Sequence, residues 1–299
     1  MEDLHFTYPG GTYALRGINL EVRSNDNIFC LMGPNGAGKT TLVRILSTQL
    51  KPSKGYVEVL GYPLSDAKRI RREIAIMPQE GRPLGDVTPW EFVYWLLVAR
   101  GWSFSEAKMR TEEVLKDLDL WEYRSKPCML LSGGLRRRVL LAAAMATHAA
   151  LIFLDEPTLG LDPYARRSTW ELLLRMKTSS FLFVTTNLGV EAENISTRVA
   201  LLERGVIRAI GSVEELKQEI PFRYKLVVEG HREVLEHILA AYGTRVRVAR
   251  LGDRLLVYIP SRGMLEEIVE LLASREASFR VSPIDLEDVF AVLTGGVHG

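Results

Sequence analysis

The sequence predicts an α/β chain in which a mainly parallel sheet is covered by helices and is followed by a smaller α+β domain. Up to about residue 220, short apolar runs alternate with amphipathic helical runs, which is typical of parallel strands joined by helices. A glycine-rich turn joins the first of these apolar runs to a helix. After residue 220 the strand and helix patterns follow in a different order. These three observations predict two domains, 1–220 and 221–299.

The first domain is expected to contain strands that are buried on both faces. Apolar runs at 27–32, 151–154 and 181–184 have the length and composition of such strands. Segments 13–22 and 56–60 are predicted to be strands of an added antiparallel layer. Helices are predicted at 40–50, 90–100 and 105–117, and the last two lie between the two halves of the parallel core as a helical subdomain.

The second domain is expected to have the order βαββαβ followed by a helix. Pro221 ends a charged helix at the boundary. Strands are predicted at 224–228 and 279–281, helices at 231–241, 264–273 and 286–293, and a hairpin of 245–250 with 255–259 across Gly252 and Asp253. This order is that of a ferredoxin-like unit, a common fold that does not by itself indicate a function.

Composition excludes several classes of protein. The chain is 47% hydrophobic and 25% charged, so it is neither collagen-like nor wholly disordered. Its formal net charge of +1 lacks the basic excess of a typical nucleic-acid binder, and no nucleic-acid partner is expected. Cys30 and Cys128 are too few for a disulfide framework or a four-ligand zinc site, so buried thiols in a reducing compartment are expected. The apolar run 139–154 is too short to span a bilayer, so any membrane span must come from another polypeptide.

A phosphate-binding loop follows the first predicted core strand. It consists of Gly33, Pro34, Asn35, Gly36, Ala37, Gly38, Lys39 and Thr40, in the pattern G-x-x-x-x-G-K-[ST]. The glycines allow consecutive backbone N–H groups to surround a phosphate at a helix N-terminus. Lys39 is predicted to bridge the β- and γ-phosphates, and the Thr40 hydroxyl to bind Mg²⁺.

Two acidic residues follow the apolar run at 151–154. Asp155 and Glu156 are expected at the carboxyl end of a central strand, where ligands bind in open α/β sheets. Asp155 suits Mg²⁺, and Glu156 suits the polarisation of an attacking water. The phosphate loop and this acidic pair together predict a site that hydrolyses a nucleotide.

Residues 131–135, Leu-Ser-Gly-Gly-Leu, are similar to the signature motif of the ATP-binding cassette (ABC) ATPases. The resemblance implies that Ser132, Gly133 and Gly134 close over the γ-phosphate of ATP held by a second subunit. A hydroxyl and glycine N–H groups at a helix start form an anion site. The usual fifth residue of the motif is Gln, whereas this chain has Leu135.

Further matches extend over most of residues 1–220. Tyr8 resembles the aromatic residue that stacks on adenine, and Thr41 is placed in the same nucleotide site. Gln79 resembles the glutamine that senses Mg²⁺ and the γ-phosphate, and Asp162 lies in a loop similar to the one that crosses the dimer interface. Residues 80–102 correspond to the region that contacts the membrane subunit. The spacing of their five aromatic residues alone would make most of them helix core rather than partner contacts; they are Trp90, Phe92, Tyr94, Trp95 and Trp102.

One position departs from the family pattern. The family usually has a histidine after two threonines, but here Thr185 and Thr186 precede Asn187. An amide can donate a hydrogen bond to the γ-phosphate but carries no charge and cannot shuttle a proton. Slow or partner-dependent hydrolysis is one interpretation; the other is that Asn187 is adequate because Glu156 remains.

The second domain resembles the C-terminal appendage of drug-exporter-type ABC ATPases. This resemblance is carried by the segment 286–290, the ending 293–295, and Arg136, Arg137 and Arg138 after the signature. The appendage is expected to be regulatory or dimerising, or else to complete the fold without a ligand.

The resemblance as a whole implies the ATP-binding and ATP-hydrolysing subunit of an ABC exporter. It would use ATP and Mg²⁺, pair with an identical or different ATPase subunit, and act on a separate transmembrane permease at the cytoplasmic face of the membrane. Two alternatives remain: a soluble ABC ATPase without a membrane partner, and an ATP switch that hardly hydrolyses. A kinase is disfavoured because the signature motif has no place in phosphoryl transfer to a second substrate.

Overall fold

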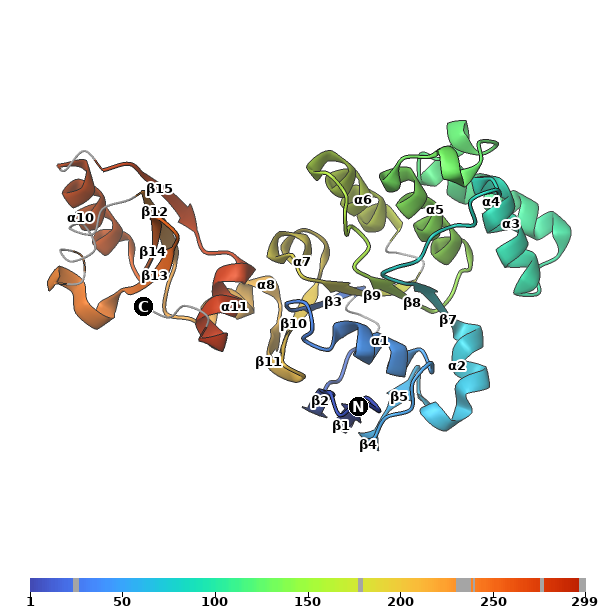
Figure 1. Cartoon of the computed structure of the whole chain (residues 1–299), viewed down its shortest axis with the longest axis horizontal. Coiled ribbons are helices and arrows are strands. Elements are labelled where there is room, and N and C mark those ends of the chain that lie inside the picture. The colour runs from blue at the N-terminus through green and yellow to red at the C-terminus, as the bar shows by residue number, and fades with distance from the viewer. Residues whose placement is uncertain (24–26, 177–179, 230–237, 239, 275–276, 296–299) are drawn as a thin grey trace. The chain divides into compact units, whose positions relative to one another are not determined.

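The computed structural model describes all residues except 24–26, 177–179, 230–237, 239, 275–276 and 296–299 (Figure 1). The chain divides into two compact units, Met1–Ile210 and Gly211–Gly299. Helix α8 (Val213–Gln218), which precedes the boundary expected at residue 220, belongs to the second unit. All of the predicted nucleotide-site residues belong to the first.

A six-stranded sheet forms the centre of the first unit, with the strand order β11-β10-β3-β9-β8-β7. In chain order these strands are β3 (Ile28–Met32), β7 (Ile74–Met77), β8 (Leu151–Asp155), β9 (Phe181–Thr186), β10 (Arg198–Glu203) and β11 (Val206–Gly211). The pairs β10–β3, β3–β9, β9–β8 and β8–β7 are parallel. β3 and β8 are buried at every position. The parallel core predicted from the apolar runs is therefore confirmed.

Helices cover this sheet, with α1 and α6 on opposite faces (Figure 1). The helices of this unit are α1 (Lys39–Leu46), α2 (Ala67–Glu73), α3 (Pro89–Ala99), α4 (Phe104–Asp117), α5 (Gly133–Ala146), α6 (Pro163–Met176) and α7 (Gly189–Ile195). α3 and α4 begin with capping boxes, Thr88 with Glu91 and Ser103 with Glu106, which satisfy the free N–H groups of their first turns. They form the helical subdomain that the sequence predicts.

An antiparallel layer accompanies the parallel sheet, but two of its predicted strands end earlier than expected. Its order is β2-β1-β4, from β1 (Glu2–Thr7), β2 (Tyr13–Ile18) and β4 (Lys54–Tyr56). The strand predicted at 13–22 ends at Ile18. The segment predicted at 56–60 is divided, since β4 ends at Tyr56, and the chain then turns at Leu60 and Gly61, whose φ angles are 53° and 78°. β5 (Glu58–Val59) and β6 (Tyr62–Pro63) therefore form a separate two-stranded ribbon.

The other differences in the first unit are local. β1 was not expected, because its polar positions mask the alternate burial of Leu4 and Phe6. α1 ends at Leu46 rather than at residue 50. Thr48 has a φ of 64°, and the amides of Gln49 and Leu50 both donate to the carbonyl of Arg44, which closes the helix in a left-handed turn.

The second unit contains a four-stranded antiparallel sheet with the order β13-β14-β12-β15. Besides α8, its elements are β12 (Tyr224–Glu229), β13 (Arg247–Leu251), β14 (Arg254–Ile259), α10 (Arg262–Ala273), β15 (Phe279–Pro283) and α11 (Leu286–Thr294). The hairpin turns at Gly252, whose φ is 60°. Most of the helix predicted at 231–241 lies outside the described residues. The strand order is that of the predicted ferredoxin-like unit.

Two expectations from composition concern the membrane and the thiols. Among the described residues, none of the helices has both the length and the apolarity to cross a bilayer. Cys30 and Cys128 are buried and free, and desolvation by burial raises the pKa of both thiols. A buried thiol with a raised pKa is a poor nucleophile and behaves as a small apolar side chain.

Candidate functional site

The predicted phosphate loop joins β3 to α1. At two of its positions, close backbone contacts leave no room for a side chain and therefore require glycine. A Cβ atom on Gly33 would lie 2.2 Å from the carbonyl oxygen of Leu202. Gly38 has a φ of 110°, and its Cβ atom would lie 2.7 Å from the carbonyl oxygen of Ala14. The loop is thus pressed between the end of the sheet and β2, which fixes the main chain that would surround a phosphate.

Lys39 reaches back across its own loop. Its Nζ donates to the carbonyl oxygens of Gly33 at 2.8 Å and Pro34 at 3.1 Å. It also lies 3.1 Å from Oε1 of Glu156, and the two side chains are only 4% and 5% exposed. The ammonium group is therefore buried in the cradle and paired with the predicted catalytic carboxylate.

A chain of hydrogen bonds links three predicted residues from distant segments. The Thr40 hydroxyl donates to Oε1 of Gln79 at 3.2 Å, and Nε2 of Gln79 donates to Oε2 of Glu156 at 3.1 Å. The structure thus brings together a residue in the first turn of α1, a residue that follows β7 and a residue that follows β8. These polar groups satisfy one another, and each of them could instead bond to phosphate or water.

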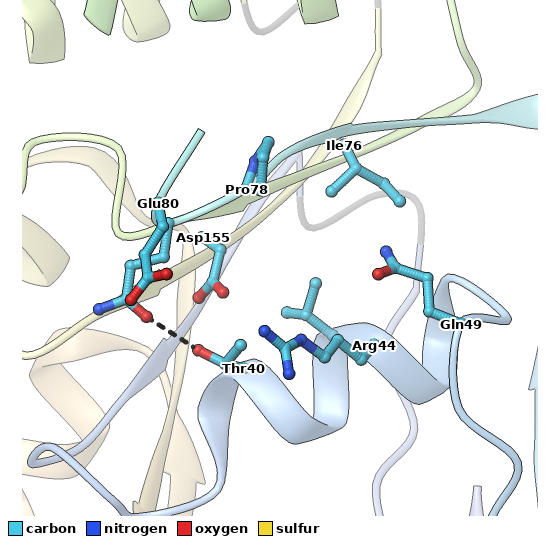
Figure 2. Close-up of a pocket in the computed structure, with 9 residues that line it drawn as sticks. Thr40, Arg44, Gln49, Ile76, Pro78, Glu80 and Asp155 are labelled. Carbon is cyan, nitrogen blue, oxygen red and sulfur yellow. Dashed lines mark hydrogen bonds between the residues drawn. The ribbon is translucent and has the colours of Figure 1, made fainter. Parts of the chain in front are cut away.

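Asp155 and Thr40 line a small pocket of about 140 Å³ (Figure 2). The carboxylate of Asp155 points toward α1, close to the Thr40 side chain (Figure 2), and also accepts from the Thr185 hydroxyl of the neighbouring strand. Gln79 lines the same pocket. A hydroxyl, a carboxylate and an amide oxygen are the hard oxygen ligands that Mg²⁺ prefers, usually together with substrate phosphates. Arg44 also lines this pocket, although the sequence placed it only within a helix.

Glu156 has an unusual backbone conformation. Its φ is 50°, a left-handed conformation that costs a residue with a side chain about 1–3 kcal/mol. Its N–H donates to both the carbonyl and the hydroxyl oxygen of Thr185, at 3.1 and 3.0 Å. Such strain persists only where neighbours hold it, and it is found most often at functional sites.

A cavity of about 290 Å³ opens beside the phosphate loop. Its lining residues are Tyr8, Thr12, Tyr13, Ala14, Asn35, Gly36, Gly38, Lys39, Thr40, Thr41, Gln79 and Glu156. The Tyr8 hydroxyl bonds to the Thr41 hydroxyl at 3.0 Å, so the ring is held at the edge of the loop. Tyr13 is a second aromatic residue of this cavity that the sequence placed only in a strand.

Asn187 follows β9, the strand that lies between β3 and β8. Its Nδ2 donates to Oδ1 of Asn35 in the phosphate loop at 3.4 Å. The side chain therefore lies beside the phosphate loop.

Comparisons with known proteins agree with this geometry. A family model described as ABC transporter matches residues 15–159. The daunorubicin/doxorubicin resistance ATP-binding protein DrrA of Streptomyces peucetius is 31% identical, over 95% of this chain and 89% of its own length. The chain belongs to the ABC transporter ATP-binding subunits. It is an ATP-binding and ATP-hydrolysing protein of that family, as its motifs imply.

Two further relatives support this membership. The doxorubicin resistance ATP-binding protein DrrA of Mycobacterium tuberculosis (strain ATCC 25618 / H37Rv) is 34% identical, over 79% of this chain and 71% of its own length. A dimeric ATP-binding cassette, solved in a post-hydrolysis state with ADP and Pi, is 26% identical with a TM-score of 0.64. That match covers 71% of this chain and 97% of the solved chain. The relatives do not favour the soluble non-transport ATPase or the ATP switch.

The remaining predicted residues of this ABC subunit are not among those that line the two pockets. Ser132 caps α5 by accepting from the N–H of Leu135 at 3.2 Å, and Ser132 and Gly133 are exposed while Gly134 is partly buried. Asp162 is also exposed and caps α6, because its Oδ1 accepts from the N–H groups of Tyr164 and Ala165, each at 3.0 Å.

A further residue of the site, besides Arg44 and Tyr13, was missed by sequence reasoning. Arg137 served there only as a mark of the subgroup, but its side chain is buried and bonds to the main chain on both sides of Glu156. No local motif could have revealed this, because its acceptors are backbone carbonyls of other segments.

Proposed function

We propose that this ABC subunit binds Mg²⁺-ATP, dimerises with an identical or different ATPase subunit, and energises a separate transmembrane permease that exports drug-like compounds. It would lie at the cytoplasmic face of the membrane, held there by the permease. The observation that carries the proposal is the linked set of Lys39, Thr40, Gln79 and Glu156 around one cavity. The drug-resistance names of the DrrA relatives support the exporter class.

Different residues of the chain would bind the nucleotide, hold Mg²⁺ and activate the attacking water. The loop N–H groups and Lys39 would hold the β- and γ-phosphates, and Tyr8 the adenine ring. Thr40, Asp155 and Gln79 would hold Mg²⁺, which neutralises the charge on the phosphate oxygens. Glu156 would orient and deprotonate the attacking water, with Gln79 fixing its carboxylate.

The predicted site residues that lie outside the nucleotide cavity support a second subunit. Ser132 and Gly133 expose a hydroxyl and N–H groups at the start of α5, an arrangement that binds anions. Asp162 is exposed at the start of α6. Both segments are therefore available to a nucleotide held by a partner subunit, and two chains would complete two sites.

Helix α3 is the best candidate for the surface that meets the permease. Trp95 is 57% exposed, although Val93 and Leu97 of the same helix are buried. Phe92 and Leu96 line a groove of about 280 Å³ that also includes Pro78, the neighbour of Gln79. A partner in this groove would therefore sense movement of the Gln79 segment directly.

The partner is tested by purifying the tagged full-length chain from detergent-solubilised membranes of its own host. We expect an integral membrane protein to co-purify and to stimulate ATP hydrolysis. Trp95→Ala is expected to weaken that association by about tenfold, because exposed aromatic anchors often contribute 1–3 kcal/mol or more, while ATP hydrolysis by the isolated chain stays unchanged. Purification with ribosomes or DNA, and without a membrane protein, would contradict the proposal.

Asn187→His is expected to raise kcat for ATP hydrolysis by about tenfold. Removal of one transition-state donor elsewhere costs about 10²–10³-fold, and an amide retains part of that interaction. Asn187 already lies beside Asn35 in the loop, so a histidine there is close to the phosphate position. Steady-state phosphate release in Mg²⁺ and ATP measures the effect. An unchanged kcat would show that Asn187 is adequate as it stands.

A further inference from the structure

Arg137 joins the signature helix to the loops of the nucleotide site. It lies in the second turn of α5 and is 9% exposed. Its guanidinium donates to four main-chain carbonyls: Gln79 at 2.6 Å, Asp155 at 3.2 Å, Pro157 at 3.1 Å, and Glu156. One side chain thus holds the main chain on both sides of Glu156 and the carbonyl of Gln79.

The backbone conformation of Glu156 requires stabilising contacts from other segments. A non-glycine residue with a φ of 50° persists only when its surroundings over-determine it. Thr185 holds the amide side of Glu156, and Arg137 holds the carbonyl side. The position of the guanidinium therefore helps to set the direction in which the Glu156 side chain leaves the backbone.

An arginine suits this role better than a lysine. Its five N–H donors lie in one rigid plane, whereas lysine offers three donors from a single nitrogen. Burial lowers the pKa of Arg137, and Asp155, Glu156 and Glu191 oppose that shift. Because arginine does not deprotonate in proteins, the group remains a fixed cation among these carboxylates.

We propose that Arg137 is a positioning residue that transmits the state of residues 132–134 to Glu156 and Gln79 of the same chain. This rests on the proposed dimer, in which the phosphate facing Ser132 belongs to ATP held by the other subunit. α5 begins directly after Ser132 and carries Arg137, so a displacement of the helix start moves the guanidinium and the carbonyls bonded to it. ATP bound by one subunit thereby adjusts the position of the Glu156 carboxylate in the other subunit.

The first test is Arg137→Lys in the full-length chain. We expect kcat to fall about 10–100-fold, since a misplacement of about 1 Å has this effect, while the Kd for ATP changes less than about threefold. Arg138→Lys is the matched control. Arg138 lies on the same helix but bonds to Ser168 and pairs with Asp119, so an unchanged kcat is expected. An unchanged kcat in Arg137→Lys would overturn the proposal.

A double-mutant cycle with Ser132→Ala separates transmission from a merely structural role. If Arg137 carries the signal from Ser132, the loss of kcat in the double variant is smaller than the product of the two single losses. Losses that multiply would overturn the proposal. Thermal unfolding of each variant checks that the fold is intact.

If Arg137→Lys does not fold, hydrogen exchange in Ser132→Ala with ATP gives the second readout. We expect faster amide exchange in residues 156–161, and unchanged exchange there would overturn the proposal. A parent chain that neither binds nor hydrolyses ATP would instead refute the proposed function. If the parent hydrolyses ATP and Arg137→Lys matches it, only the role of Arg137 fails.

Discussion

We expect Glu156→Gln to bind ATP but to lose its hydrolysis, with kcat reduced by about 10²–10⁴-fold, the usual contribution of a positioned general base. The carboxylate is almost fully buried, and Lys39 and Gln79 each contact it at 3.1 Å. An amide of the same size preserves much of this packing but cannot accept a proton from water. Phosphate release measures kcat, and a fluorescent ATP analogue measures the Kd, which should change less than about threefold.

The matched control for this variant is Glu171→Gln. Glu171 lies on the exposed side of α6 and pairs with Arg167 at 3.5 Å, an interaction of little energetic value. Its kcat is therefore expected to equal that of the parent. If Glu156→Gln also hydrolysed ATP at the parental rate, another group would have to activate the water.

The local parts of the nucleotide site could be predicted from the sequence because their chemistry requires contiguous residues. A phosphate loop needs glycines, Lys39 and Thr40 at a fixed spacing between a strand and a helix, and the structure places them so. Asp155 ends the buried strand β8 and Glu156 follows it for the same reason. The meeting of Thr40, Gln79 and Glu156 follows from the strand order, since β8 and β3 flank β9.

The parts that could not be predicted depend on contacts between distant segments. Arg137 donates its hydrogen bonds to backbone carbonyls, which every residue possesses, so no sequence pattern predicts these bonds. The left-handed conformation of Glu156 has no sequence signal either, because glycine or asparagine would ordinarily mark it. Likewise, α1 ends at Leu46 because Thr48 adopts a positive φ, whereas its helical pattern continues to residue 50.

Lys39→Ala is expected to weaken ATP binding by about 10²-fold. An ammonium group that bonds to phosphate oxygens contributes about 1.5–3 kcal/mol per bond, and about 2.7 kcal/mol corresponds to this change in Kd. Lys39 is buried in the loop, where it bonds to the carbonyls of Gly33 and Pro34. None of the other residues that line the cavity beside the phosphate loop is a cation that could substitute for it. Lys51→Ala is the control, because Lys51 is exposed beyond the end of α1.

The same variant is expected to lower the free energy of unfolding in the absence of nucleotide. It leaves the buried carboxylate of Glu156 without its cation, and removal of one partner of a buried ion pair typically costs about 3–5 kcal/mol. Glu156→Gln removes the charge that is left unpaired, so the double variant should lose less stability in urea than the sum of the single variants. ATP binding should stay weakened by about 10²-fold in Lys39→Ala and in the double variant. Additive losses of stability would show that the Lys39–Glu156 pair contributes little to the fold, and that Lys39 is retained for phosphate alone.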